Sequence, residues 1–334
     1  MNTSILVMLA AEPWAITSAA LQDIMARAGE LSPDMFASAD DEQVAGYYAV
    51  GSRSGSRTGT VAVVSVYGML TKRDSLFSML MGGTSYTRLS AQIRQLAADD
   101  TVAAIMLNID SPGGQGQGVG ELAAEVRRAR ESKPVIALAN ALMASAAAWI
   151  GWSADEVIAT PDAIVGSQGA FALHIDTSKA LEMEGVKPTY IASSGAKAGG
   201  RPGLPLDDDT QAEMQAIVDE NNRLFVADVA AGRGLTPAQV KDQYGNGAVF
   251  SARDAKKRGM VDRIATYPET LARLSGVKPA GVRAEADFPE IEAIADELVP
   301  DLPESALADG PSLLPATAAS ARFRFDSDYR FTHR

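Results

Sequence analysis

Residues 134–152 read PVIALANALMASAAAWIGW and decide how the rest of the chain is interpreted. Residues 134–138 form an apolar run typical of a buried strand, and Asn140–Trp152 begins a run of small, helix-forming residues. Ser145 lies at the expected strand-to-helix transition, flanked by alanines that leave its hydroxyl open. The first turn of a helix presents unpaired N–H groups that favour negative charge developing on an oxygen. Ser145 is therefore a candidate nucleophile; the alternative is a serine that caps a tightly packed helix.

Apolar and amphipathic segments alternate on both sides of this stretch. We expect strands at residues 60–67, 102–109, 134–138, 156–159, 164–165 and 189–192. We expect helices at residues 14–28, 87–98, 118–130, 177–184, 208–231, 236–244 and 251–258, besides the one that follows Ser145. Strands and helices that alternate at this length predict an α/β fold with right-handed βαβ units and a mostly parallel sheet.

The composition divides the chain into three predicted parts. Residues 1–58 are expected to form an N-terminal helix and a linker, and residues 59–276 the α/β domain. Residues 277–334 form an acidic tail: residues 281–320 carry nine acidic side chains against the single Arg283, which predicts a largely disordered segment. The last fourteen residues, ARFRFDSDYRFTHR, interleave aromatic and basic side chains that suit docking on another protein; the alternative is a solvated tail without a role.

Charge and residue counts exclude several classes of function. The net charge of −12 argues against nucleic-acid binding, which needs a basic face. The absence of cysteine excludes disulfides, thiolate metal sites and cysteine nucleophiles. Only two histidines are present, His174 and His333, so we expect no metal and no other cofactor. The apolar run at residues 5–11 is too short to span a membrane and lacks the basic flank of a signal peptide, which predicts a soluble, cytoplasmic protein.

A glycine pair follows the expected strand 102–109. Residues 108–114 read NIDSPGG, at the edge where open parallel sheets place their ligand sites. Paired glycines let the backbone approach a substrate closely. The amides of Gly113 and Gly114 are therefore candidate oxyanion donors for a tetrahedral intermediate. The alternative is an ordinary Pro-Gly turn.

Three more side chains are candidates for the chemistry. Lys197 lies in an expected flexible loop and would act as a general base if burial lowered its pKa; the alternative is a solvated lysine. Ser167 follows the expected strand 164–165, and its hydroxyl would orient the lysine amine or cap a turn. His174 is interpreted as a hydrogen-bonded structural histidine.

Four motifs occur together in a fixed order: SPGG at 111–114, MASAAAWIG at 143–151, VGSQG at 165–169 and SGAK at 194–197. This set, over residues 60–265, resembles peptidase family S49, the signal peptide peptidase A family of serine–lysine proteases, and within it the phage head-maturation branch. The resemblance implies a ClpP/crotonase-like fold, with Ser145 as nucleophile and Lys197 as general base. It also implies that Ser167 orients the lysine and that Gly113 and Gly114 form the oxyanion hole. The family usually has glycine and aromatic residues after the nucleophile, where this chain has Ala146–Trp149.

The resemblance implies a serine endopeptidase of phage capsid maturation, associated with the procapsid in the host cytoplasm. Expected partners are scaffold, portal or coat proteins as substrates, the chain itself at the small residues 315–321, and further copies of the chain in a homo-oligomer. In some family members the serine and lysine come from neighbouring subunits. Two alternatives remain open: an inert scaffold protein that keeps the protease fold, and a crotonase-fold enzyme acting on a CoA thioester, which needs neither Ser145 nor Lys197.

Overall fold

The structure of the 334-residue chain is a computed structural model that describes residues 13–28, 48–52, 59–74, 83–201 and 203–276. The acidic tail at 277–334, with the candidate self-cleavage stretch 315–321, lies outside the described residues, as does most of the expected linker. The division into three parts therefore stays a prediction.

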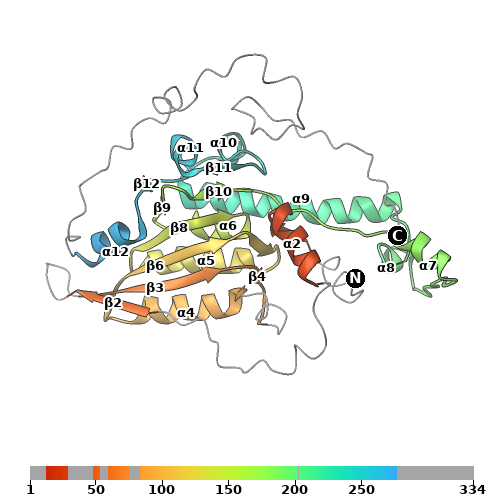
Figure 1. Ribbon diagram of the computed structural model, residues 1–334, viewed down its shortest axis with the longest axis horizontal. Coiled ribbons are helices and arrows are strands. Elements are labelled where there is room, and N and C mark those ends of the chain that lie inside the picture. Colours follow the sequence, from red (N-terminus) through yellow and green to blue (C-terminus); the bar gives the residue numbers. More distant parts are fainter. Residues whose placement is uncertain (1–12, 29–47, 53–58, 75–82, 202, 277–334) are drawn as a thin grey trace, which may run out of the picture. The chain divides into compact units, whose positions relative to one another are not determined.

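A mostly parallel sheet forms the centre of the described chain (Figure 1). Its strands run in the order β11-β10-β8-β6-β3-β2, and the short β9 and β12 extend it beside β8. The neighbours β3, β6 and β8 are parallel, whereas β2 and β11 are antiparallel edge strands. The bounds are β2 Tyr48–Ser52, β3 Gly59–Tyr67, β6 Val102–Ser111, β8 Val135–Ala144, β9 Glu156–Ala159, β10 Ile164–Gly166, β11 Val249–Ser251 and β12 Arg263–Ile264. The predicted parallel sheet is confirmed, and so are five of the six predicted strands.

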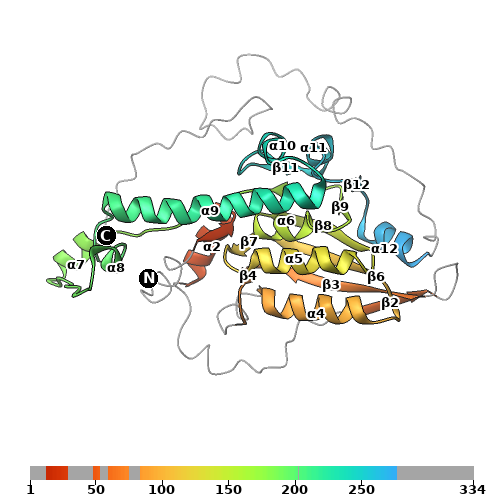
Figure 2. The same ribbon diagram turned by 180° about the vertical axis from the view of Figure 1, so that it is seen from behind.

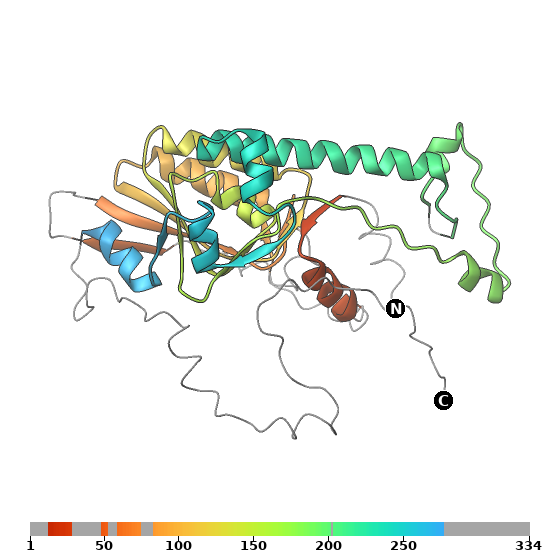
Figure 3. The same ribbon diagram turned by 90° about the horizontal axis from the view of Figure 1, so that it is seen from above.

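Helices cover both faces of this sheet (Figures 2 and 3). On one face lie α4 (Tyr86–Ala98), α5 (Val119–Arg130) and α6 (Ala146–Gly151), and α9 (Asp208–Arg233) packs against α5 and α6. The other face carries α12 (Tyr267–Ser275). In α4 the buried residues Leu89, Ile93 and Leu96 recur at the helical spacing that predicted it, and the Ser85 hydroxyl caps its first turn. Two short helices, α10 (Pro237–Gln243) and α11 (Ala252–Lys257), complete the predicted set.

A second, smaller sheet lies next to the carboxyl end of β6. It contains β1 (Trp14–Ile16), β7 (Gly113–Gln115), β4 (Leu70–Thr71) and β5 (Thr84–Ser85), in the order β1-β7-β4-β5. The helix predicted at 14–28 is wrong at its start, because residues 14–16 are the strand β1 and α2 begins only at Ser18 (Ser18–Ala28). The exposed edge of β7 gives β1 an antiparallel partner, and Thr17 Oγ1 then accepts the N–H of Ala20 as α2 begins.

Three further predictions were wrong or incomplete. Residues 189–192 form no strand, because these residues are mostly exposed and none of the described strands pairs with them. Lys197 lies in the short helix α8 (Gly195–Ala198) rather than in a loop; the predicted helix before it is confirmed as α7 (Ser178–Met183). Tyr48–Ser52, expected to belong to a loose linker, pairs with β3 as β2. We did not predict α12, although the capping box of Thr266 and Glu269 marks its start in the sequence.

Candidate functional site

Ser145 occupies a strained turn between β8 and α6. Its φ of 55° and ψ of −119° lie outside the regions that residues with side chains ordinarily adopt. The turn is held by two backbone hydrogen bonds, in which Ser145 N–H donates to the Gly166 carbonyl at 2.8 Å and the Ser145 carbonyl accepts from Trp149 at 2.9 Å. Ser145 is only 1% exposed. A sharp strand-to-helix turn of this kind places a serine hydroxyl at the end of the strand, as in the nucleophile elbow of α/β-hydrolases.

The glycines of β7 lie directly beside Ser145. A methyl group added to Gly113 would lie 3.0 Å from Ser145 Cβ, closer than side chains pack. A methyl group on Gly114 would lie 1.8 Å from the Leu70 carbonyl oxygen, so both positions require glycine. The Gly113 N–H donates to Ser111 Oγ at 3.2 Å. The structure therefore brings the predicted glycines and the predicted nucleophile together.

The turn after β10 forms the other side of the site. Its backbone is left-handed at Ser167, with a φ of 57°, and the Ser167 N–H donates to the Ala248 carbonyl at 2.7 Å. β10 pairs with β8 in parallel, with Gly166 opposite Ala144, which places Ser167 next to Ser145. The Ser145 hydroxyl donates to the Gly169 carbonyl across a long 3.5 Å contact. Sequence reasoning singled out Ser167 but missed the carbonyl groups of Gly166 and Gly169, because backbone acceptors leave no signal in residue type.

The nucleophile helix α6 is anchored by α9. The Trp149 ring stacks on Phe225 with ring centroids 4.5 Å apart and planes 9° from parallel. Its Nε1–H donates to Asp228 Oδ2 at 2.8 Å, and Arg127 donates to Asp228 Oδ1 at 2.8 Å. These contacts fix the first turn after Ser145. The spacing of Phe225 predicted a buried helix face, but nothing in the sequence pointed to Asp228 as a partner of Trp149.

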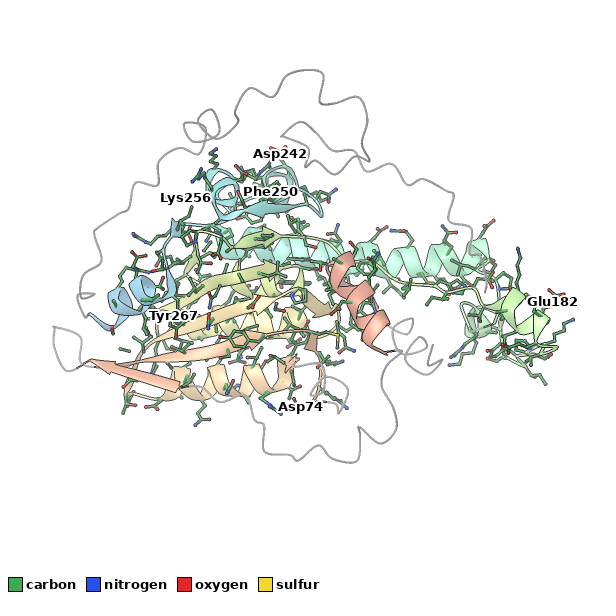
Figure 4. The ribbon with its side chains drawn as sticks, viewed as in Figure 1. Asp74, Glu182, Asp242, Phe250, Lys256 and Tyr267 are labelled. Atoms are coloured by element: carbon green, nitrogen blue, oxygen red, sulfur yellow. The ribbon has the colours of Figure 1, made fainter. Side chains whose placement is uncertain are left out.

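The short helix α8, which contains Lys197, lies at the other end of α9 from this anchor (Figure 1). Gly199, two residues later in the chain, is so close to Thr210 that an added methyl group would lie 2.2 Å from Thr210 Oγ1. Thr210 and Phe225 are separated along α9 by about 22 Å at 1.5 Å of helix rise per residue. Within one chain, the structure therefore does not bring Lys197 to Ser145. Figure 4 shows Glu182 of α7 at the same remote end.

The surroundings of Lys197 are open and partly apolar. The side chain is exposed and lines a shallow hollow of about 490 Å³ together with Tyr190, Ile191, Ala192, Ser193, Ala198 and Arg201. Ile191 is 99% exposed, and Met183 of α7 is 89% exposed. Apolar side chains this exposed in one neighbourhood are typical of surfaces that contact another protein.

The remaining candidates add no further chemistry. The Nε2 atom of His174 is buried and has no hydrogen-bond partner among the described residues, contrary to the expected hydrogen-bonded histidine. Partial burial raises the pKa of Asp110, at the end of β6, against a hydrogen bond from the Leu142 N–H that lowers it. The described segments contain no cluster of acidic and histidine side chains that could hold a metal ion. Among the described helices, none is long and apolar enough to cross a membrane.

Comparison with known proteins shows which family the chain resembles. Residues 127–279 match the model of peptidase family S49. The chain is 30% identical over 265 residues to capsid assembly protease C of Escherichia phage lambda, which covers 77% of this chain and 58% of the relative. It is 28% identical over 266 residues to head-tail preconnector protein GP5 of Enterobacteria phage P21, covering 78% and 51%. Protease 4 of Salmonella typhi is 29% identical over 229 residues, covering 68% and 36%.

The chain therefore spans less than two thirds of the length of these curated relatives. Together, the parallel sheet, the helical layers and the family match confirm the expected ClpP/crotonase-like α/β fold. The expected resemblance to peptidase family S49 is confirmed as well, by the family model over residues 127–279 and by the similarity to a phage capsid assembly protease.

Proposed function

We propose that this protein is a serine endopeptidase in which Ser145 is the nucleophile and Lys197 of a second copy is the general base. The observation that carries the proposal is the strained turn that holds Ser145 between the glycines of β7 and the turn at Ser167. Non-glycine backbone in such a conformation costs about 1–3 kcal/mol and is found mainly at functional sites. The match of residues 127–279 to a peptidase family model supports the same assignment.

The position of Lys197 favours a base supplied by another copy. In its own chain the lysine lies at the far end of α9 and is exposed. A lysine amine acts as a base only when desolvation lowers its pKa toward neutrality. Docking of the exposed apolar residues around α8 onto a second copy would remove water from the amine and bring it to that copy's Ser145. The Ser167 hydroxyl would then orient the amine.

The chemistry follows the usual two steps of a serine peptidase. The neutral Lys197 amine takes the proton from Ser145 Oγ as the oxygen attacks a peptide carbonyl. The Gly114 amide would donate to the resulting oxyanion, and the Gly113 amide would join it by giving up its 3.2 Å hydrogen bond to Ser111 Oγ. The protonated lysine then gives its proton to the departing amine, leaving an acyl-enzyme. A water molecule deprotonated by the same lysine hydrolyses the ester and frees Ser145.

The substrates that we propose are proteins of capsid assembly: scaffold, portal or coat subunits, cut within a procapsid in the host cytoplasm. This part of the proposal is supported by the relatives named for capsid assembly and for a head-tail preconnector in two phages. The inert scaffold protein predicts that Ser145 does not react with serine-directed reagents, and a CoA enzyme predicts that substitution of Ser145 leaves activity intact. Labelling with such a reagent and substitution of Ser145 therefore distinguish these two alternatives from the peptidase.

A complementation experiment tests the proposal. Ser145→Ala and Lys197→Ala are each expected to be inactive alone toward a capsid-protein substrate. When the two are co-expressed, random assembly should restore about a quarter of wild-type activity, because one pairing in four joins an intact serine to an intact lysine. An inactive mixture of correctly assembled chains would place both residues in one chain. Unchanged activity in either single variant would overturn the proposed dyad.

A further inference from the structure

Residues 13–17, directly before α2, form an extended segment between β7 and the backbone of Phe171, beside the candidate nucleophile. We call the space between these two backbone edges the channel. On one edge, β1 pairs antiparallel with β7, the strand of the candidate oxyanion glycines. On the other edge, the Trp14 N–H donates to the Phe171 carbonyl at 2.7 Å, and the Phe171 N–H donates back at 2.9 Å. Figure 2 shows α2, which follows β1 in the chain, next to β7 and β4. An extended peptide bonded on both edges is how proteins commonly bind another chain by strand addition.

The register aligns Ala15 with the site. Bonded pairs flank it on both sides: the Gly116 N–H donates to the Pro13 carbonyl at 2.9 Å, and the Thr17 N–H donates to the Pro112 carbonyl at 3.0 Å. Hydrogen-bonded pairs in an antiparallel ladder recur every second residue. Ala15 and Gly114 are opposite each other midway between these pairs, so the ladder directs the Gly114 N–H to the Ala15 carbonyl. The amide proposed as oxyanion donor thus faces a peptide carbonyl of the chain itself.

The Ala15 carbonyl is also next to the nucleophile. A methyl group added to Gly113 would lie 2.2 Å from the Ala15 oxygen and 3.0 Å from Ser145 Cβ. The oxygen and Ser145 Cβ are therefore within about 5 Å of each other, near direct packing contact. The peptide group that follows Ala15 occupies the place that a substrate's peptide group would need.

β1 closes the channel. Trp14 and Ala15 are each 1% exposed and Ile16 is 3% exposed, while Ser145 beneath them is 1% exposed. An external peptide cannot pair with β7 at Gly114 while Ala15 does so, because each strand edge accepts one partner. The alanine at the position nearest Ser145 is enclosed, and a larger side chain there would meet packed neighbours.

We propose that residues 13–17 are a built-in peptide ligand of the catalytic channel, seated as a substrate would be, with Ala15 next to Ser145. The inference rests on the proposed function and extends it in two ways. The channel accepts protein substrates only after β1 has left it. The substrates that it then accepts are extended segments with an alanine-sized residue at the position of Ala15.

A reversible disulfide tests whether β1 leaves the channel. The chain contains no cysteine, so Trp14→Cys/Gln115→Cys would carry only the two introduced thiols. Trp14 and Gln115 face each other as a non-hydrogen-bonded pair of the antiparallel ladder. In such pairs the Cα atoms are about 4.5 Å apart, a distance at which a disulfide can form. The measurement is the rate at which a fluorophosphonate labels Ser145 in the full chain. We expect labelling to be slower by about tenfold or more in the oxidised form, because the reactive open state is depleted.

A second variant releases β1 without a crosslink. Trp14→Ala removes the buried anchor of the strand, and we expect Ser145 to be labelled about tenfold faster or more than in the wild-type chain. Leu96→Ala is the matched control, since it removes a buried side chain of α4 far along the chain from β1. It should lower thermal stability without raising the labelling rate. Circular dichroism confirms that both variants stay folded.

A synthetic peptide tests the substrate class. The peptide Ala-Glu-Pro-Trp-Ala-Ile-Thr-Ser, which has the sequence of residues 11–18, should protect Ser145 of the Trp14→Ala variant from labelling. The same peptide with phenylalanine in place of its second alanine should not protect. Equal protection by both peptides would overturn the size preference.

The outcomes separate the inference from the function on which it rests. Equal labelling of the wild type, Trp14→Ala and both redox states would show that β1 is a permanent strand, and would overturn the inference while Ser145 remains a reactive nucleophile. If no form is labelled above the Ser145→Ala background, the proposed peptidase function fails, and the inference fails with it.

Discussion

The two ends of α9 lie in very different surroundings. Near its carboxyl end, Phe225 and Val229 are fully buried against α6, and an aromatic stack and two hydrogen bonds to Asp228 hold the nucleophile turn. Near its amino end, α7 and α8 carry Lys197 among side chains as exposed as Ile191. One chain thus packs the candidate nucleophile completely but leaves the candidate base exposed.

This difference separates what folding supplies from what assembly must supply. Ser145, Gly113, Gly114 and Ser167 come from strand ends whose positions the parallel sheet determines. A strained turn can be kept there because dense packing surrounds it. Lys197 lies on a segment without a packed core of its own, so the proposed role as a base requires burial against another protein. Substitutions near the packed end of α9 should therefore change stability, whereas substitutions near its exposed end should change assembly.

The largest effect is expected at Gly114 in β7. Gly114→Ala places a methyl group 1.8 Å from the Leu70 carbonyl oxygen, which belongs to backbone and cannot move aside alone. The small sheet would have to separate, which we expect to lower the free energy of unfolding by about 3 kcal/mol or more. Activity should be lost with it. Urea denaturation measures the first effect and peptide hydrolysis the second.

Gly195→Ala in α8 is the matched control. An added methyl group there meets nothing within 4 Å, so the free energy of unfolding should stay within about 0.5 kcal/mol of wild type. Equal destabilisation by the two substitutions would contradict the contrast between the packed and exposed ends of α9.

Much of the packed end could be predicted from sequence, and the reasons are local. Apolar runs such as 102–109 can satisfy their pattern only as buried parallel strands, and the residues at their carboxyl ends then meet at one edge. That argument placed the glycine pair at this edge, and the family resemblance joined Ser145 and Ser167 to it. The argument from apolar runs failed for Trp14–Ile16, whose apolar spacing suits a helix equally well. The strand forms because β7, which is distant in the sequence, offers an edge with which it can pair. Local sequence does not contain this information.

The location of Lys197 could not be predicted for a similar reason. The SGAK motif gave the residue but not its distance from Ser145, because that distance is set by the direction and length of α9. The predicted strand 189–192 would have tied the lysine to the sheet. Its residues are instead exposed, with Ile191 at 99%. An apolar run can be satisfied by a partner chain as well as by a core, and sequence alone does not separate the two.

An intermediate effect, dependent on pH, is expected where α9 ends. Arg233 donates to both oxygens of Asp262, at 2.6 and 2.8 Å, and the Val157 N–H donates to the same carboxylate at 2.7 Å. Burial pushes the pKa of Asp262 upward, but these hydrogen bonds and the Arg233 charge outweigh it and lower the pKa below its ordinary value. The ionised Asp262 carboxylate therefore stabilises the folded state fully above its unfolded pKa of about 3.9. This stabilisation is lost as the pH falls toward its pKa in the folded state.

Asp262→Asn measures this contribution. Because the carboxylate is 37% exposed, we expect a loss of only about 1–2 kcal/mol in the free energy of unfolding at pH 7. The difference between wild type and variant should shrink as the pH is lowered from 5 to 3, about one unit on either side of the unfolded pKa. A difference that stays constant over this range would show that the charge of Asp262 is not what stabilises the contacts with Arg233 and Val157.

The smallest effect on stability, and the sharpest test of the comparison, is expected at Ile191. Ile191→Asp removes no buried area, so the free energy of unfolding should change by less than about 0.5 kcal/mol. If the surface around Lys197 docks on a second copy, a carboxylate at its most exposed apolar position would have to be desolvated on assembly, and both oligomer formation and activity should fall. Ile164→Asp, at a 44% exposed isoleucine of β10, is the matched control and should leave the oligomer intact. Sedimentation velocity gives the oligomeric state. An Ile191→Asp protein that assembles and cleaves like wild type would mean that the exposed end of α9 is simply a solvated surface, and that Lys197 reaches its serine by another route.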